Sequence, residues 1–395
     1  MREINKIYLI HFLAGLTNAA SVTFTLYFLS HGLSQAQIGG LFGIFMIVMA
    51  VFNIPTGAIA DMFGHKLSVF IGLIFQALSF LLFYAYPHYF GFLLGFIASG
   101  IGLAFQTGAI SSLIYEILRK ENLHEDFQKV VGKAGGYMLL AGIIASPIGS
   151  FIYKTNPGLP YFLSFLSFAI AALVIFFVKW EFTKKSSSLG QYFDVMATGI
   201  RLTVKNKVLV GIVIIGSVLT LGRLLLNQNI LQPYQIKIGI DVSYIGITAA
   251  IINAVTALIA FNAYKFYQKF GRAFSVLVMI FLPAICAMLL SLVNNLFSLS
   301  FIILFYTGHG LRDPIFSQIT YGEVESDKRS TMVSTIGFLT SIVAGLLLPI
   351  WGKGIDLFGI PNILFLLGIF TLIFGGLGFY ILESQSNRFS AKLSK

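Results

Sequence analysis

Charged residues are scarce in this sequence of 395 residues: they make up only 10% of the chain, against about 25% in soluble proteins. Hydrophobic residues make up 57%, and the mean hydropathy is +0.88. A chain of this composition cannot cover a water-facing surface, which excludes a set of soluble domains. The 39 glycines and 40 phenylalanines suit helices packed in lipid. We therefore expect an integral membrane protein.

Cysteine is almost absent as well. The one cysteine, Cys286, cannot form an internal disulfide, and no residue spacing supports a metal site. The sequence shows no nucleophile with a base and no phosphate-binding loop, so we expect no enzyme, no catalytic residue, no cofactor and no use of ATP. No cleavable signal peptide is visible, because the first apolar run, from about Ile7, is long enough to remain as a membrane helix.

Acidic residues are the rarer charge, with 15 Asp and Glu against 26 Lys and Arg and a net charge of +11. The basic residues lie at the ends of apolar runs. This placement favours anionic membrane lipid over nucleic acid as the partner.

A bilayer requires roughly 20 apolar residues for each spanning helix, and twelve such runs are present. They cover about 7–30, 36–60, 67–86, 89–117, 130–153, 160–180, 208–235, 242–263, 274–293, 296–320, 331–353 and 361–383. With a cytoplasmic N-terminus, the cytoplasmic segments hold 21 of the 26 basic residues, the outer loops hold three, and Arg223 and Arg312 fall inside spans. This distribution predicts a multi-pass protein of the bacterial cytoplasmic membrane with both termini in the cytoplasm.

The longest polar stretch, 181–207, separates an N-terminal six-helix bundle (1–180) from a C-terminal one with a short basic tail (208–395). Within it, Phe193, Met196, Ile200 and Val204 recur at helical spacing. The pattern predicts an amphipathic helix on the inner membrane surface. The alternative is a linker that is merely helical.

The two halves repeat when the chain is shifted by 207 residues. Tyr27 then falls on Tyr234, and three pairs of glycines coincide: Gly32 with Gly239, Gly39 with Gly246, and Gly64 with Gly271. One offset that holds over three spans indicates two six-helix bundles of common origin. Parallel repeats with a site at the middle of the membrane are typical of one class of secondary transporter.

The stretch 55–66 carries a signature between the second and third spans. It resembles the loop 2–3 motif of the major facilitator superfamily, which Gly57, Asp61, Gly64 and Lys66 match, whereas Met62 and His65 replace basic positions. The resemblance covers the whole chain and implies a twelve-helix, all-α membrane fold of two pseudo-symmetric bundles. It also implies that this motif holds the halves together in one transport state.

Glu116 resembles the family's acidic partner for the basic residues of this motif, here His65 and Lys66; the alternative is a solvated acid at a helix end. Span 5 carries Gly142, Pro147 and Gly149, which resemble a degraded antiporter signature, or else form an ordinary proline kink. Span 4 has Ala98 near the place where many proton–drug antiporters have arginine, which argues against a standard multidrug antiporter.

Ionisable residues inside spans are functional candidates because each costs roughly 2.5–3.5 kcal/mol to insert. In span 10, His309 and Asp313 share a helical face beside Arg312. Asp313 is the candidate proton carrier, with Glu116 as the second and His309 beside it; the alternative is a static Arg312–Asp313 pair. The candidate residues of the substrate cavity are Arg223, Asn227, Gln228, Arg312, His11, Asn18, Tyr27 and Tyr234.

We therefore expect a monomeric secondary transporter that moves a small molecule by alternating access. The preferred hypothesis is export of drugs or metabolites driven by the proton gradient. The alternative is transport of an organic anion, or uniport, through Arg223 and Arg312. A lipid transporter of the same fold is a further alternative.

Overall fold

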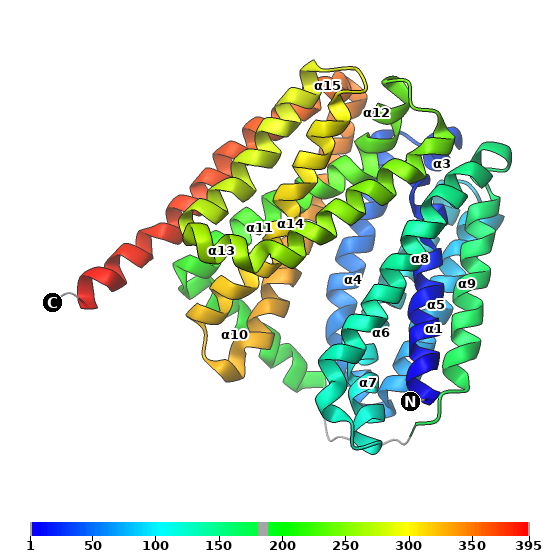
Figure 1. The fold of residues 1–395 in the computed structure, drawn as a ribbon, viewed down its shortest axis with the longest axis horizontal. Helices are drawn as coiled ribbons and strands as arrows, with labels where there is room; N and C mark the ends of the chain where they lie inside the picture. The colour runs from blue at the N-terminus through cyan, green and yellow to red at the C-terminus, as the bar shows by residue number, and fades with distance from the viewer. Residues whose placement is uncertain (1, 181–188, 394–395) are drawn as a thin grey trace. The chain divides into compact units, whose positions relative to one another are not determined.

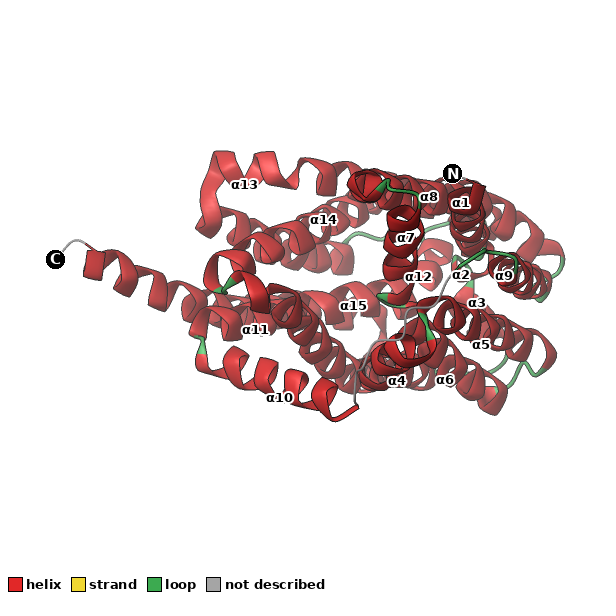
Figure 2. Ribbon diagram, turned by 90° about the horizontal axis from the view of Figure 1, so that it is seen from below, coloured by secondary structure: helices red, strands yellow, loops and turns green. Residues whose placement is uncertain are grey.

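The structure is a computed structural model that describes residues 2–180 and 189–393. Within these ranges the chain is made of helices and loops, with no strand (Figures 1 and 2). The first part contains α1 (Arg2–Leu16), α2 (Asn18–Ser21), α3 (Phe24–Ser30), α4 (Gln35–Phe63), α5 (His65–Ala85), α6 (Tyr89–Gln106), α7 (Ala109–Lys120), η1 (His124–Asp126), α8 (Phe127–Thr155) and α9 (Leu159–Phe176). The second part contains α10 (Leu189–Lys205), α11 (Lys207–Leu225), the π-helical η2 (Leu226–Ile230), α12 (Leu231–Lys237), α13 (Val242–Leu292), α14 (Ser298–Glu323), η3 (Ser326–Lys328) and α15 (Arg329–Leu393).

The helices agree with twelve membrane spans. Within the described ranges, eight helical segments are long and apolar enough to cross a membrane, and the pair Glu3–Ser21 and Phe24–Ser30, bent by 45°, makes a ninth. Two of the eight, α13 and α15, are each interrupted by a glycine with a non-helical backbone, Gly271 and Gly359, and so contain two spans apiece. Charged α14 completes the set. The expected all-α membrane fold is confirmed.

The chain divides into two compact units that interleave along the sequence. Unit 1 contains 1–33, 44–193 and 241–250, and unit 2 contains 34–43, 194–240 and 251–395. The segments 34–43 and 241–250 are related by the same offset of 207 residues. Each half therefore gives the start of its second span to the unit built mainly from the other half.

Aromatic residues fill the core of unit 1. In Figure 1, α1 lies between α8 and α9, and it contacts both. Phe24 stacks on Tyr161 at 5.7 Å between ring centroids, and Phe28 meets the edge of Phe92 at 4.7 Å. Because lipid tails are as apolar as these rings, the close packing of the rings, rather than exclusion of water, holds the bundle together.

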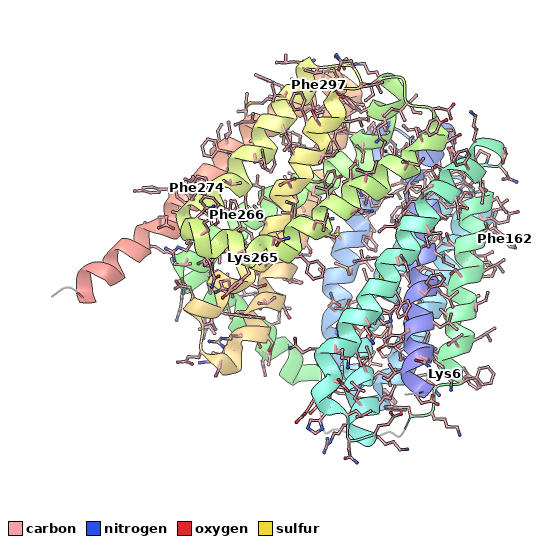
Figure 3. The ribbon with its side chains drawn as sticks, viewed as in Figure 1. Lys6, Phe162, Lys265, Phe266, Phe274 and Phe297 are labelled. Carbon is pink, nitrogen blue, oxygen red and sulfur yellow. The ribbon has the colours of Figure 1, made fainter. Side chains whose placement is uncertain are left out.

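The core of unit 2 is aliphatic and is centred on α11, which packs along α15. Near the middle of α13, Phe266 and Phe274 lie on either side of the break at Gly271, with 6.2 Å between their ring centroids (Figure 3). The fully packed interior contains Val208, Leu209, Ile212, Ile215, Leu219, Ala263, Val276, Met279, Ile280, Leu311, Ile315, Phe316, Ile319, Met332, Ile336 and Leu382.

The backbone confirms the internal repeat. Gly64 and Gly271 both have positive φ, +100° and +75°, and both stand at the turn between two spans. Gly32 and Gly239 form a second pair at the same offset, with φ of +80° and +93°. These backbone angles favour glycine because the Cβ of any other residue would be crowded against the backbone there. The repeat therefore preserves the turns of the fold.

Tyr27 and Tyr234 occupy equivalent positions but do not line open space. Each side chain is only 2% exposed, and each hydroxyl donates to a backbone carbonyl 56 residues further along, Phe83 or Leu290, at 3.1 and 3.2 Å. The structure thus corrects our expectation that they flank a cavity. A buried phenol needs a partner for its O–H, and here the partner is the end of a neighbouring span.

Helix α10 forms within the expected linker. Met196 is half-buried, with its sulfur 3.9 Å from the hydroxyl of Thr335 on α15, whereas Arg201 and Lys205 are exposed. Val204, expected on the apolar face, is 68% exposed. Residues 181–188 and the side chain of Phe193 lie outside the described part of the chain. The helix is therefore confirmed, and its contact with the membrane stays a prediction.

Candidate functional site

Irregular backbone marks the first, fourth and seventh spans. The first span is broken between α1, α2 and α3, the fourth is broken at Gly108 (φ +78°) between α6 and α7, and the seventh contains the π segment η2. At membrane depth, irregular backbone is tolerated where it is buried in protein or lines a water-filled cavity. The π segment lies in unit 2, and the polar side chains of unit 2 gather around it.

The seventh and tenth spans face each other through polar side chains. Arg223 ends the regular part of α11, and Asn227 follows one turn later within η2. On α14, the hydroxyl of Tyr306 donates to the Asn227 Oδ1 at 3.3 Å. The strongest electrostatic neighbours of Arg223 are Arg312, Tyr306 and Asp313. Tyr306 is therefore a neighbour of both Arg223 and Asn227.

Arg312 is held in place by two side chains. Its Nη1 donates to the Thr220 hydroxyl at 2.7 Å, and its Nε donates to the Asp313 Oδ1 at 2.7 Å. The Arg312 side chain is 15% exposed and that of Asp313 is 77% exposed. Both residues line a cavity of about 190 Å³ between α11, α14 and α15, together with Gly216, Thr220, Phe316, Ser317, Thr320, Val333, Ile336, Gly337 and Thr340.

Two buried cationic or polar groups of this cluster lack partners. The Arg223 Nε is buried, and among the described residues Arg223 makes no hydrogen bond or ion pair. His309 is 6% exposed, its ring lies 4.8 Å from that of Phe305, and neither ring nitrogen has a hydrogen-bond partner in the described structure. Buried polar groups are normally satisfied, so such exceptions suggest a site that a ligand or water completes.

The unit 2 cluster is therefore rich in positive charge. It contains two guanidinium groups and one carboxylate, and that carboxylate is 77% exposed and bonded to Arg312. Thr220 and Tyr306 belong to the cluster, and our sequence analysis missed both. Thr220 lies three residues before Arg223, on the turn that faces α14, and this spacing is the signal that could have identified it. Gln228 is half-buried in η2, next to Asn227.

A second cluster lies in unit 1, at the turn between α4 and α5. The His65 Nδ1 is 2.8 Å from the Glu116 Oε1, and its Nε2 is 3.5 Å from the Asp61 Oδ1. The other Glu116 oxygen accepts a 2.6 Å hydrogen bond from the indole N–H of Trp180. The family-derived pairing of Glu116 with His65 is thus present. A cavity of about 930 Å³ adjoins these residues.

Trp180 was not anticipated, because it is the last residue of the apolar run 160–180 and belongs to no motif. Its ring covers Gly64, where an added Cβ would lie 2.0 Å from the indole. The segment before it is also fixed, since Lys66 and Lys6 donate to the carbonyls of Phe176 and Phe177 at 2.8 and 2.7 Å. Figure 3 labels Lys6 at the foot of α1. Lys66 therefore binds the end of α9 and not Glu116. Gly57 is half-buried on α4.

The remaining candidates of unit 1 pack against helices. The His11 Nδ1 is hydrogen-bonded to the carbonyl oxygen of Ile7, which accepts, at 2.9 Å. The side-chain amide of Asn18 donates to the Gly15 carbonyl at 3.1 Å. A Cβ added at Gly142 would lie 2.5 Å from the Asn18 amide nitrogen. Gly149 allows the equally close approach of α2, because its Cβ would lie 2.1 Å from a backbone oxygen there.

The segments 34–43 and 241–250 each pack a glycine against the carbonyl that precedes a proline. Gly246, at the start of α13, lies against the Ser146 carbonyl, directly before Pro147. Its repeat mate Gly39 lies in the same way against the Leu348 carbonyl of α15, directly before a proline. An added Cβ would approach these oxygens to 1.9 and 2.5 Å. The antiporter-like stretch of α8 therefore serves as a docking surface for α13.

Comparison with known proteins identifies the family. The model of the Major Facilitator Superfamily matches residues 7–346. The chain belongs to the major facilitator superfamily. An uncharacterized MFS-type transporter of Methanocaldococcus jannaschii is 25% identical over 369 residues, which cover 89% of this chain and 90% of the relative.

Solved structures of this superfamily share the fold. The nucleoside transporter NupG superimposes with a TM-score of 0.81 at 14% identity, covering 96% of this chain and 99% of NupG. A bacterial homologue of the human lysosomal transporter Spinster gives 0.77 at 15% identity, covering 97% and 96%. The superfamily member described here is therefore a multi-pass membrane transport protein for a small molecule, and not an enzyme.

Proposed function

We propose that this transporter carries a small organic anion by alternating access and that Arg223 and Arg312 bind its anionic group. The observation that carries the proposal is the half-buried Arg223 side chain, whose Nε is buried and which makes no hydrogen bond or ion pair among the described residues. A cation inside a membrane protein is costly unless something pairs with it. An anionic substrate provides that partner, and arginine binds carboxylate and phosphate in a bidentate manner.

The surrounding groups support an anion over a cation. A site for a lipophilic cation needs an uncompensated acid, whereas Asp313, the only acid of the cluster, is exposed and bonded to Arg312. Thr220 and Tyr306 add hydroxyl groups, and neither ring nitrogen of His309 has a hydrogen-bond partner among the described residues. The geometry therefore favours the organic-anion hypothesis over export of cationic drugs.

Proton coupling follows from the same contacts if the substrate competes for Arg312. An anion bound to Arg312 would leave Asp313 without its cation, and a carboxylate without a cation takes up a proton more readily. Asp313 is therefore our proposed carrier, and it would load a proton together with the anion. In unit 1, Glu116 with His65 is the proposed second carrier.

The test is proton and solute flux in proteoliposomes with a trapped pH dye. The panel includes an aryl carboxylate, 5-aminolevulinic acid, a dipeptide, a nucleoside and a lipophilic cation, because a POT-family neighbour was solved with 5-aminolevulinic acid and another neighbour is a nucleoside transporter. We expect anions to be carried, and we expect Arg223→Met to abolish their flux. Arg201→Met removes the same charge from an exposed position on α10 and is the control.

Two results would contradict the proposal. One is transport of only cations or neutral solutes, and the other is normal anion flux in the Arg223→Met protein. For coupling, anion flux that still acidifies the vesicle lumen in Asp313→Asn would exclude Asp313 as the carrier.

We further propose a monomer in the cytoplasmic membrane, in contact with anionic lipid, with both termini on the cytoplasmic side. The only cysteine, Cys286, is buried, so single introduced cysteines can report topology. Lys237→Cys should react with an impermeant maleimide in intact cells, and Lys328→Cys should react only after lysis. The reverse pattern would invert the orientation.

A further inference from the structure

The π segment η2 lies between two sets of contacts in unit 2. On one side, Asn227 accepts the hydrogen bond of Tyr306 beside the anion site. On the other, Asn229 is fully buried and donates from its Nδ2 to both the backbone oxygen and the side-chain oxygen of Gln35, each at 2.9 Å. Two residues of one short segment thus connect the anion site with the first residue of α4.

The π geometry determines where these two asparagines point. An α-helix turns about 100° for each residue, and a π segment accommodates one additional residue, so everything after it is rotated by about that amount relative to the helix before it. If the segment relaxed to a regular α-helix, Arg223 and Asn229 could not both keep their present directions. The hydrogen bonds to Gln35 therefore help to maintain the direction of the residues that face α14.

Gln35 is itself fixed by α15. The backbone N–H groups of Gln35 and Ala36 donate to the two carboxylate oxygens of Asp356, each at 2.9 Å. The backbone of α15 also packs closely here, since a Cβ at Gly352 would lie 2.3 Å from the Gln35 oxygen. The contact partner of Asn229 is consequently held from two directions.

The equivalent place in unit 1 lacks this connection. The position 207 residues before Asn229 is Val22, which has no polar side chain, and it lies between α2 and α3 rather than in a π segment. The start of α13 is instead held by Lys154, which bonds Asp241 at 2.9 Å. Lys154 therefore provides a matched control: it also fixes the start of an exchanged segment, but it has no contact with the anion site.

We infer that Asn229 and Gln35 are positioning residues for the anion site: their hydrogen bonds hold η2 in the form that directs Arg223 and Asn227 toward α14. This inference rests on the proposed binding of an anion by Arg223. Neither residue touches the substrate. Their effect is on affinity, transmitted through the backbone of η2, and it links anion binding to the docking of the start of α4.

The experiment measures the half-saturating concentration of sulfate, used as the probe anion, from its effect on the unfolding temperature of the purified full-length protein. Ionic strength is kept constant with chloride. We expect Asn229→Leu and Gln35→Met to raise this concentration about 5- to 30-fold, within the usual range for coupled sites. Gln35→Glu retains an acceptor oxygen and should stay within about 2-fold of the wild type. Lys154→Met should bind sulfate as the wild type does.

The outcomes separate the inference from the proposed function. If Arg223→Met leaves the half-saturating concentration unchanged, or if the wild type shows no saturable sulfate effect, the anion site is wrong and the inference falls with it. If Arg223→Met raises the half-saturating concentration roughly 30-fold while Gln35→Met binds normally, only the inference is wrong. Gln35→Met keeps the backbone acceptor and so decides the question even if Asn229→Leu does not fold. A purely structural role would lower stability without moving the half-saturating concentration.

Discussion

Replacing Arg223 by Met should make the protein without ligand more stable while it weakens anion binding. Arg223 is buried at its Nε and has no acidic partner among the described residues. Exchange of buried charged groups for apolar residues of similar volume often stabilises a protein by about 1–4 kcal/mol. With an unfolding entropy of about 2.1 cal/mol/K per residue over 395 residues, this corresponds to a rise of roughly 1–5 °C.

The loss of affinity follows from the contact that the substitution removes. Truncation of one partner of a buried, hydrogen-bonded charge pair costs about 2–5 kcal/mol. Because Arg312 remains to bind the anion, the lower end applies, and about 2 kcal/mol weakens binding roughly 30-fold. The assay combines the unfolding temperature without ligand with an anion titration of the same preparation.

Arg272→Met is the matched control in the same unit. The Arg272 Nε lies 3.0 Å from the Glu383 Oε1 and its Nη1 lies 3.8 Å from the Glu323 Oε1, so its loss leaves two acids unpaired and should lower the unfolding temperature. The reasoning is refuted if Arg223→Met lowers the unfolding temperature as Arg272→Met does and leaves anion binding intact. Arg223 would then be a structural brace.

Three further predictions test the framework around the site. Gly64→Ala should destabilise the protein more than Gly271→Ala, by about 1–3 kcal/mol, because both glycines have positive φ but only Gly64 is covered by an indole ring. Thermal unfolding compares the two variants, and equal losses of stability would contradict the argument. Gly39→Ala should abolish transport while the neighbouring Gly40→Ala retains it, since only the former would press a methyl group into a backbone carbonyl, and equal flux would show that this crossing is not tight. The hydrogen bonds from Lys154 and from the backbone of Ser243 lower the pKa of the Asp241 carboxyl from 3.8 to about 2. The contribution of Asp241 to folding stability is therefore complete above about pH 4 and is lost as the pH falls toward 2. The difference in unfolding temperature between wild type and Asp241→Asn should stay constant from pH 5 to 8.

The helices and their repeat could be predicted from the sequence because the membrane imposes length and hydropathy on every span. The offset that pairs Gly64 with Gly271 also placed the turns correctly, since a positive φ leaves little choice of residue. Position along a span, however, does not say which way a side chain points. Tyr27 fits the rim of a cavity as well as a buried hydroxyl bound to a carbonyl, and only the packing of the neighbouring span decides between them.

The polar cluster around η2 was predicted only in part, because spacing along the sequence identifies some of its residues and not others. Arg223 and Asn227 are four residues apart, a spacing that predicts one common face in a regular α-helix. The π segment leaves no such pattern, because it shifts the register by about one residue without changing composition. Asn229 was therefore not identified, although it lies two residues beyond Asn227. Trp180 was missed because its partner Glu116 is 64 residues away in the sequence.

The exchange of segments 34–43 and 241–250 between the two units has a consequence for how the chain arose and how it is made. A single six-helix half that donated its own segment to an identical copy, and received the same segment in return, would be a segment-swapped dimer, and such swaps require little new sequence. Fusion of two such copies into one chain would place the exchanged segments at a constant offset, as the 207 residues between 34–43 and 241–250 do. The first unit also cannot be completed during synthesis until residue 250 has emerged, so the first half waits for the beginning of the second.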